Sequence, residues 1–353
     1  MVRGILRRVD GFQRRHSTIS FPLAVIYKFF DDQGSYLAAL ITYYGFLSLI
    51  PLLLLLTSIL GFVLQGNESL RMQILDSAIS QFPVLGPELE EPSGLPGSGL
   101  GVAVGLAIAL YGALGVGQAL QNAMNVMWAV PRHRRPNPLL SRFRGLALLF
   151  IGGAVVLATT VLGWIGDIVA AYGTDVGRGW SLLAVLAAVM LNTGVFGLAF
   201  RIATATRLSR SHLWPGALVA AIAWQLLQLT GAALVRQVAG ANATYATFAV
   251  VLGLLGWLFL AALAVVLSVE INVVRTKRLY PRSLLTPFVD DVELTPADRR
   301  AYGDAALAQR AKSFQAIRVR FEPAENGTPA DVPVVAPGEN PAPRAVSPSD
   351  AAG

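Results

Sequence analysis

Residues 36–64 read YLAALITYYGFLSLIPLLLLLTSILGFVL, a long run without a charged side chain. A helix needs about 20 apolar residues to cross the hydrocarbon core of a bilayer. Five further charge-free windows follow along the chain, at 92–131, 145–166, 179–200, 211–235 and 237–269. The sequence therefore predicts an all-α integral membrane protein with six transmembrane helices, near 36–64, 99–127, 145–169, 180–201, 213–236 and 245–272.

The composition agrees with this fold class. The chain of 353 residues is 54% hydrophobic and 14% charged, with a mean hydropathy of +0.56. Soluble domains are roughly a quarter charged. This balance favours the membrane class over a soluble globular protein.

Lysine and arginine near the predicted helix ends indicate the orientation. Eighteen of these residues lie in the N-terminal segment, in the second-to-third and fourth-to-fifth connections, and directly after the sixth helix. The alternate connections contain only Arg71, Arg178 and Arg236. Both termini are therefore expected in the cytoplasm. This placement also accounts for the net charge of +7 without nucleic-acid binding, because basic residues at helix ends set topology and meet anionic headgroups.

Three regions are expected along the chain. Residues 1–35 form a cytoplasmic amphipathic segment, with an interfacial or solvated helix over 1–15 and a second helix from Pro22 to Gly34. Residues 36–280 form the membrane domain, which includes an exterior loop at 65–98 with an amphipathic helix. Residues 281–353 form a cytoplasmic tail, with a short helix near 296–314 capped by Thr295 and disorder after it, because seven prolines follow from Pro323 onward.

Residues 118–125, QALQNAMN, place four amides inside a charge-free window. They fall at i, i+3, i+4 and i+7 and so share one helical face. Unsatisfied amides facing lipid would cost several kcal/mol. The amides therefore line a polar path or bond to other helices, and both alternatives remain open. The residues are Gln118, Gln121, Asn122 and Asn125.

Other polar residues suggest where such a path would lie. Most are expected between the middle of the membrane and its cytoplasmic face, which is the asymmetry of a polar cavity open toward the cytoplasm. These candidates are Thr42, Tyr43, Tyr44, Asn192, Gln225, Gln228, Glu270 and Asn272. Arg201 ends the fourth span on the same side, so an ion pair between Arg201 and Glu270 is predicted. The alternative is that Glu270 meets Arg275 or solvent.

Enzyme chemistry finds no support in the sequence. The chain has no cysteine, and its three histidines, His16, His133 and His212, stand in separate cytoplasmic segments. No zinc-protease, serine-hydrolase or nucleotide-binding motif is present. We expect no catalytic residues, metal or cofactor. The expected partners are membrane lipids and a small-molecule or lipid substrate.

Four segments resemble the YihY/BrkB family of bacterial inner-membrane proteins. They are YLAALITYYGFLSLIPLLLL (36–55), QALQNAMNVMWAVP (118–131), LWPGALVAAIAWQL (213–226) and TYATFAVVLGLLGWLFLAALAVVLSVEINVV (244–274). The resemblance covers roughly residues 20–280 and implies six helices in the plasma (inner) membrane. Members often carry the label ribonuclease BN, but the scattered histidines here do not suit a zinc nuclease. The family often has glycine before the last helix's glutamate, where this chain has Val269.

The leading functional expectation is a transporter, exporter or lipid-handling protein with a polar cavity open toward the cytoplasm. Polar residues within a membrane are functional candidates by default. The alternative is a non-transporting scaffold that organises envelope assembly.

Overall fold

The computed structural model describes residues 10–63, 69, 72–74, 99–170, 174–238, 243–284, 286 and 292–321. These residues are helical or irregular, and no strand occurs among them. The all-α prediction is confirmed. Most of the predicted exterior loop at 65–98 and the predicted disordered tail lie outside the described residues.

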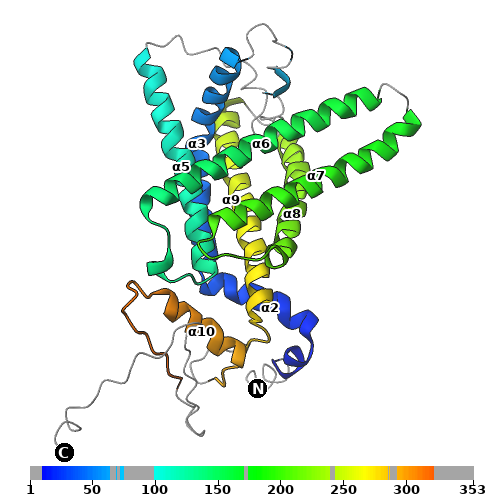
Figure 1. Ribbon diagram of the computed structural model, residues 1–353. Coiled ribbons are helices and arrows are strands. Elements are labelled where there is room, and N and C mark those ends of the chain that lie inside the picture. Colours follow the sequence, from blue (N-terminus) through cyan, green and yellow to red (C-terminus); the bar gives the residue numbers. More distant parts are fainter. Residues whose placement is uncertain are drawn as a thin grey trace, which may run out of the picture.

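Six long helices form the body of the protein (Figure 1). Their lengths run from 29 to 35 residues, enough for about 44–52 Å of helix axis. They are α3 (Gly34–Val63), α5 (Gly99–Met127), α6 (Pro138–Ala170), α7 (Thr174–Ala203), α8 (Arg210–Val238) and α9 (Ala243–Lys277). Three segments within the described residues are long and apolar enough to cross a membrane: Val185–Ala203, Arg210–Gly231 and Val251–Lys277.

Helix α9 is central to the packing. It contacts α3, α5 and α8, while α5 packs on α3 and α6, and α7 joins α6 to α8. Helices α6 and α7 run obliquely to the other four (Figure 1). The core where α2, α5, α8 and α9 meet is built from small and branched apolar side chains. These include Ala24, Ala123, Ala217, Val266, Val269 and Val273.

The helix ends differ from the predicted spans where charged residues continue a helix. Helix α6 begins at Pro138 rather than near 145, and Asn137 caps it by accepting a hydrogen bond from the Leu140 amide at 2.8 Å. Helix α9 continues through Arg275 to Lys277. Absence of charge locates the membrane-compatible part of a helix, but helical hydrogen bonding does not stop where charge begins.

Helix α2 (Ser17–Asp31) lies across the end of the bundle at which α9 finishes (Figure 1). It starts five residues before the predicted Pro22, which lies inside the helix. Residues 10–15 are also helical. Helix α10 (Pro296–Ala308) lies at the same end of the molecule. It starts at the predicted residue with a capping box between Thr295 and Asp298, and it ends before the predicted 314.

Candidate functional site

A cluster of ionisable side chains lies where α2 crosses α9. Glu270 is seven residues before the end of α9, about 10 Å along the helix axis, and its side chain is fully buried. Lys28 and Asp32 stand four residues apart on α2 and in the turn that follows it, so both face α9. Lys28 forms an ion pair with Asp32 and donates to the Met127 carbonyl at the end of α5, at 3.3 Å. The cluster thus joins α2, α5 and α9.

The carboxyl group of Glu270 has an unusual environment. Both of its oxygens are buried, and neither accepts a hydrogen bond from an N–H or O–H donor. The charged side chains that act on it are Lys28, then Asp32 and, more weakly, Asp31. Two ionised carboxylates cannot hydrogen-bond to each other, so a hydrogen bond between Asp32 and Glu270 requires a proton on one of them.

The two α2 side chains respond to this environment in the same direction. Burial raises the pKa of the Asp32 carboxyl, although the charge of Lys28 opposes the rise. Burial alone would lower the pKa of Lys28, but the nearby Glu270 and Asp32 carboxyl groups outweigh it, and the pKa is raised. The ammonium therefore stays charged.

Asn272, two residues after Glu270, fastens α9 to the first turns of α8. Its side chain accepts a hydrogen bond from the Gly216 amide at 2.8 Å and donates to the Leu213 carbonyl at 3.1 Å. Pro215 lies between these two residues and has no N–H to donate. A Cβ added at Gly216 would lie 2.1 Å from the Ser268 carbonyl oxygen. The segments 214–216 (WPG) of α8 and 268–272 (SVEIN) of α9 are therefore in close contact with each other.

Two of the four predicted amides on α5 form contacts between elements. Gln121 donates to the Ser141 carbonyl of α6 at 2.9 Å and accepts from the Ser141 hydroxyl at 3.1 Å. Asn125 accepts from the Ala205 amide after α7 at 3.0 Å. Both side chains are buried. Their polar atoms are thus engaged in holding α5 to its neighbours.

The remaining predicted residues are distributed over several surfaces. Gln118 and Asn122 are exposed, and Asn122 accepts a hydrogen bond from Arg135 at 3.4 Å. Thr42 is buried and donates to the Ala38 carbonyl of its own helix, at 2.9 Å. The Tyr44 ring meets the edges of Tyr43 and Tyr111. Three further candidates lie on α7 and α8: Asn192, which is buried, and Gln225 and Gln228, which are half-buried.

The predicted ion pair between Arg201 and Glu270 is not formed in the described part of the chain. Arg201 is exposed at the end of α7, whereas Glu270 is enclosed by the core. The cation beside Glu270 is Lys28. The expectation is corrected accordingly: α2 supplies the charge that was assigned to the fourth span.

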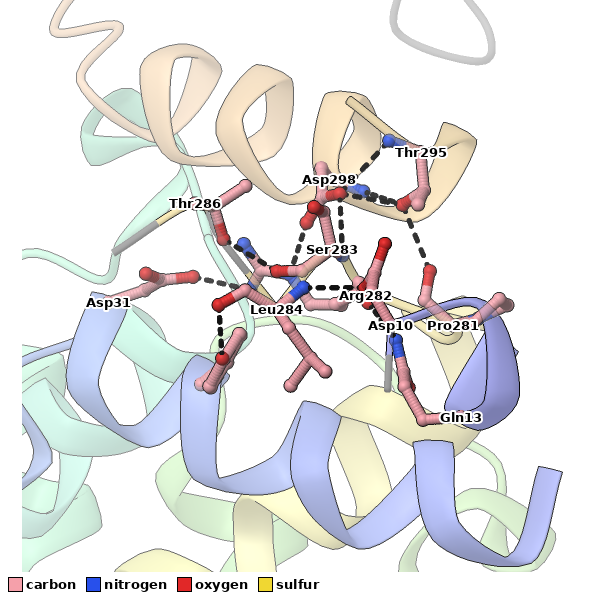
Figure 2. A network of polar contacts seen from close by, with 11 residues as sticks. Asp10, Gln13, Asp31, Pro281, Arg282, Ser283, Leu284, Thr286, Thr295 and Asp298 are labelled. Carbon is pink, nitrogen blue, oxygen red and sulfur yellow. Dashed lines mark hydrogen bonds and ion pairs between the residues drawn. The ribbon is translucent and has the colours of Figure 1, made fainter. Parts of the chain in front are cut away.

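A second buried network lies beside the first, around Arg282 (Figure 2). Arg282 follows α9 and is 1% exposed. Its guanidinium contacts Asp31 at the end of α2, at 2.5 Å, and Asp298 of α10, at 2.8 Å. Burial works against the charge, but these two carboxylates outweigh it and raise the pKa of Arg282. The network binds α10 to α2.

The N-terminal segment joins the same network. Gln13 donates to the Arg282 carbonyl at 2.5 Å, and the Leu284 amide donates to Asp10 at 2.9 Å. Asp298, which is fully buried, also accepts from the Ser283 and Thr295 amides, each at 3.0 Å. Segments from the start and the end of the described chain therefore meet at Arg282.

Sequence reasoning counted Lys28 and Arg282 among the charges that set topology and assigned no role to Asp31 or Asp32. One signal was present for Lys28 and Asp32. Their spacing of four puts them on one helical face with Ala24 and Val25, both buried, so that face points into the protein. No comparable local signal marks Arg282, because its partners lie far away in the chain.

The chain is similar in sequence to known membrane proteins. A family model described as Virulence factor BrkB matches residues 25–288, which includes α2 from Val25 onward, the six long helices and Arg282. The UPF0761 membrane protein of Psychrobacter sp. (strain PRwf-1) is 26% identical over 303 residues, covering 79% of this chain and 53% of that protein. The chain therefore spans little more than half the length of this curated relative. No solved structure matches the chain.

Proposed function

The chain belongs to the BrkB family of membrane proteins, and from this premise we propose that it is a six-span transport protein of the plasma membrane. Its termini lie in the cytoplasm, and its polar path opens toward that side. The excess of lysine and arginine in alternate connections supports the orientation. The substrate is a small molecule or a lipid.

The Lys28–Asp32–Glu270 cluster is the observation that carries the transport proposal. Ionisable groups within a membrane segment are costly and commonly mark substrate or ion pathways. Replacing a buried ion pair with apolar side chains is often neutral or stabilising, so such a cluster is not needed for stability alone. A carboxyl group with no donor at either oxygen adds to the cost. A cluster of this kind at the inner end of α9 suits a site whose protonation or ion pairing changes during transport.

A non-transporting scaffold is the second candidate, and a specific observation favours it. Gln121 and Asn125 hold α5 to α6 and to the segment after α7. A scaffold needs such contacts and needs no water-filled path. The two functions therefore differ in whether water reaches the half-buried amides of α8.

Single-cysteine accessibility tests this difference directly, because the natural chain contains no cysteine that would react. Gln225→Cys and Leu226→Cys form a matched pair on adjacent positions of α8. Gln225 is half-buried, whereas Leu226 is 57% exposed on the apolar surface. A maleimide reacts with the thiolate and so needs water at the site.

A cytoplasm-facing polar path predicts that a membrane-impermeant maleimide labels Gln225→Cys in inside-out vesicles and not in right-side-out vesicles. Leu226→Cys should stay unlabelled in both because lipid surrounds it. Absence of labelling at Gln225→Cys, with the protein folded, would contradict the transport proposal and favour the scaffold.

Reporter fusions test the six-span topology separately. Fusions after Gln65, Thr174 and Gly240 should report the exterior, and fusions after Arg134 and Arg278 the cytoplasm. A reversed signal at any of these positions would contradict the proposed arrangement.

A further inference from the structure

We propose that Asp32 and Glu270 form a proton-binding site, in which the two carboxyl groups share one proton and Lys28 neutralises the remaining negative charge. The site stands on the geometry of the cluster, whereas its role as the coupling point of transport rests on the proposed function. Its ligand is a proton taken from the cytoplasmic side.

The environment of the Glu270 side chain favours a bound proton. Its side chain is 0% exposed, and neither oxygen has a donor as a partner. An isolated buried carboxylate is strongly disfavoured and takes up a proton instead. The neighbouring Asp32 carboxyl supplies an acceptor for that proton. One shared proton thus gives Glu270 the hydrogen bond that it otherwise lacks.

The charges around the pair support one proton rather than none or two. Helix α2 and the turn after it bring Lys28, Asp31 and Asp32, and α9 brings Glu270. Asp31 pairs with Arg282, which also holds Asp298, so Asp31 belongs to the neighbouring network. With Lys28 positive and one proton shared by Asp32 and Glu270, the charges of these three side chains sum to zero.

The remaining helices in contact with α9 do not change this sum. Helices α3 and α5 contain no charged residue, and α5 contributes the carbonyl of Met127. Helix α8 begins with Arg210 and His212, both exposed. Arg275 of α9 is also exposed, and Lys277 is occupied by the Trp128 carbonyl and Asp304, each at 2.8 Å.

Loss of the shared proton would leave two carboxylates facing one ammonium across the α2–α9 contact. Like charges this close in a buried site repel, and only solvent would relieve them. Deprotonation therefore favours separation of α2 from α9 and entry of water at the inner end of the bundle. In the transport reading, this is the step that proton binding controls.

Infrared difference spectroscopy of the full chain in lipid tests the site without any transport assay. The measured quantity is the carbonyl band of protonated carboxylic acid, followed while the pH is raised and lowered. Glu270→Gln is the principal variant, because the glutamine amide can donate to Asp32 as the protonated acid would and so preserves the fold. Glu293→Gln, an exposed carboxyl before α10, is the matched control.

The wild type and Glu293→Gln should show the same titrating band above the usual carboxyl range, and Glu270→Gln should lose it. A band that is unchanged in Glu270→Gln would overturn the proposal. Failure of this test leaves the labelling of Gln225→Cys unaffected, so the proton site and the transport path can fail separately.

Lys28→Met tests the charge balance independently. Without the ammonium, the pair becomes neutral only if both carboxyl groups hold a proton, so the protonated band should grow about twofold at neutral pH. A band of wild-type size in Lys28→Met would show that Lys28 does not balance the pair, which contradicts the arrangement proposed here.

Discussion

Replacing Arg282 with methionine should release α10 from α2. Arg282 is the cation that lies between Asp31 and Asp298, and the two tyrosine rings of Tyr27 and Tyr302 lie 5.9 and 5.4 Å from its guanidinium carbon. Methionine keeps much of the length and the apolar stem but removes the charge. Asp298 then stays buried without its cation.

The size of the effect follows from the two carboxylates. Removing one partner of a buried ion pair costs about 3–5 kcal/mol. Asp298 retains hydrogen bonds from Ser283 and Thr295, and Asp31 is 35% exposed, so water can replace its partner. Both facts place the cost near the lower end, about 3 kcal/mol. Since about 1.4 kcal/mol is a factor of ten, the opening equilibrium of α10 should rise about 100-fold.

Hydrogen exchange of the α10 amides measures this opening. Peptides covering residues 296–308 should exchange about 100-fold faster in Arg282→Met, while peptides from α5 should not change. Arg282→Lys should fall between the two, because an ammonium lacks the planar fork that serves two carboxylates at once. Adding Asp298→Asn to Arg282→Met removes the unpaired charge and should recover part of the protection. Unchanged α10 exchange in Arg282→Met would refute the reasoning.

Three further predictions concern other contacts. Gly216→Ala should lower the melting temperature in detergent, because its Cβ would lie 2.1 Å from the Ser268 carbonyl oxygen. Gly194→Ala is the control: its Cβ would have no atom within 4 Å, so this change should be neutral or stabilise by up to about 1 kcal/mol. Equal melting temperatures of the two variants would contradict the close helix contact. Gln121→Leu should cost about 1 kcal/mol through its lost hydrogen bonds to α6, and a variant as stable as the wild type would remove those bonds from the account. Because folding raises the pKa of Asp32, the folded protein binds this proton more tightly, so stability should fall as the pH rises from about 4 through the raised value. Asp32→Asn should flatten that part of the stability–pH curve, and a slope that persists would exclude Asp32 as its cause.

The long helices could be predicted because their cause is local. Charge-free runs mark the segments that a bilayer or a core accepts, and α5 has the predicted ends at residues 99 and 127. The start of α6 was missed because Arg142 and Arg144 were placed outside the helix. A helix can extend beyond its apolar part when its end is capped, and Asn137 provides that cap here. The charge pattern alone does not contain that information.

The amide stripe was predicted as one face, and the structure divides it into two rows. Gln121 and Asn125 point into neighbouring elements, whereas Gln118 and Asn122 are exposed. The four amides span about two helical turns, and a neighbouring helix covers only one side of the face that they form. Periodicity places residues on a face, but which part of that face is covered depends on how α6 and α7 cross α5.

The charged clusters could be predicted least. Glu270 was identified from its depth in a membrane helix, but its partner was assigned to Arg201 by matching depth alone. The true neighbours come from α2, a helix that crosses the bundle end, and sequence separation hides such a contact. For Arg282 the partners lie 251 and 16 residues away.

The two aspartates at the end of α2 are consecutive residues that serve different networks. Asp31 holds Arg282 and through it α10, while Asp32 takes part in the cluster around Glu270. Movement of the end of α2 therefore displaces both aspartates and changes both networks at once. Thermodynamic linkage then imposes reciprocity: whatever factor protonation applies to the docking of α10, docking of α10 must apply to the affinity for the proton. A protein that binds α10 and displaces it from α2 would thereby change the proton affinity of a group buried in the helix bundle.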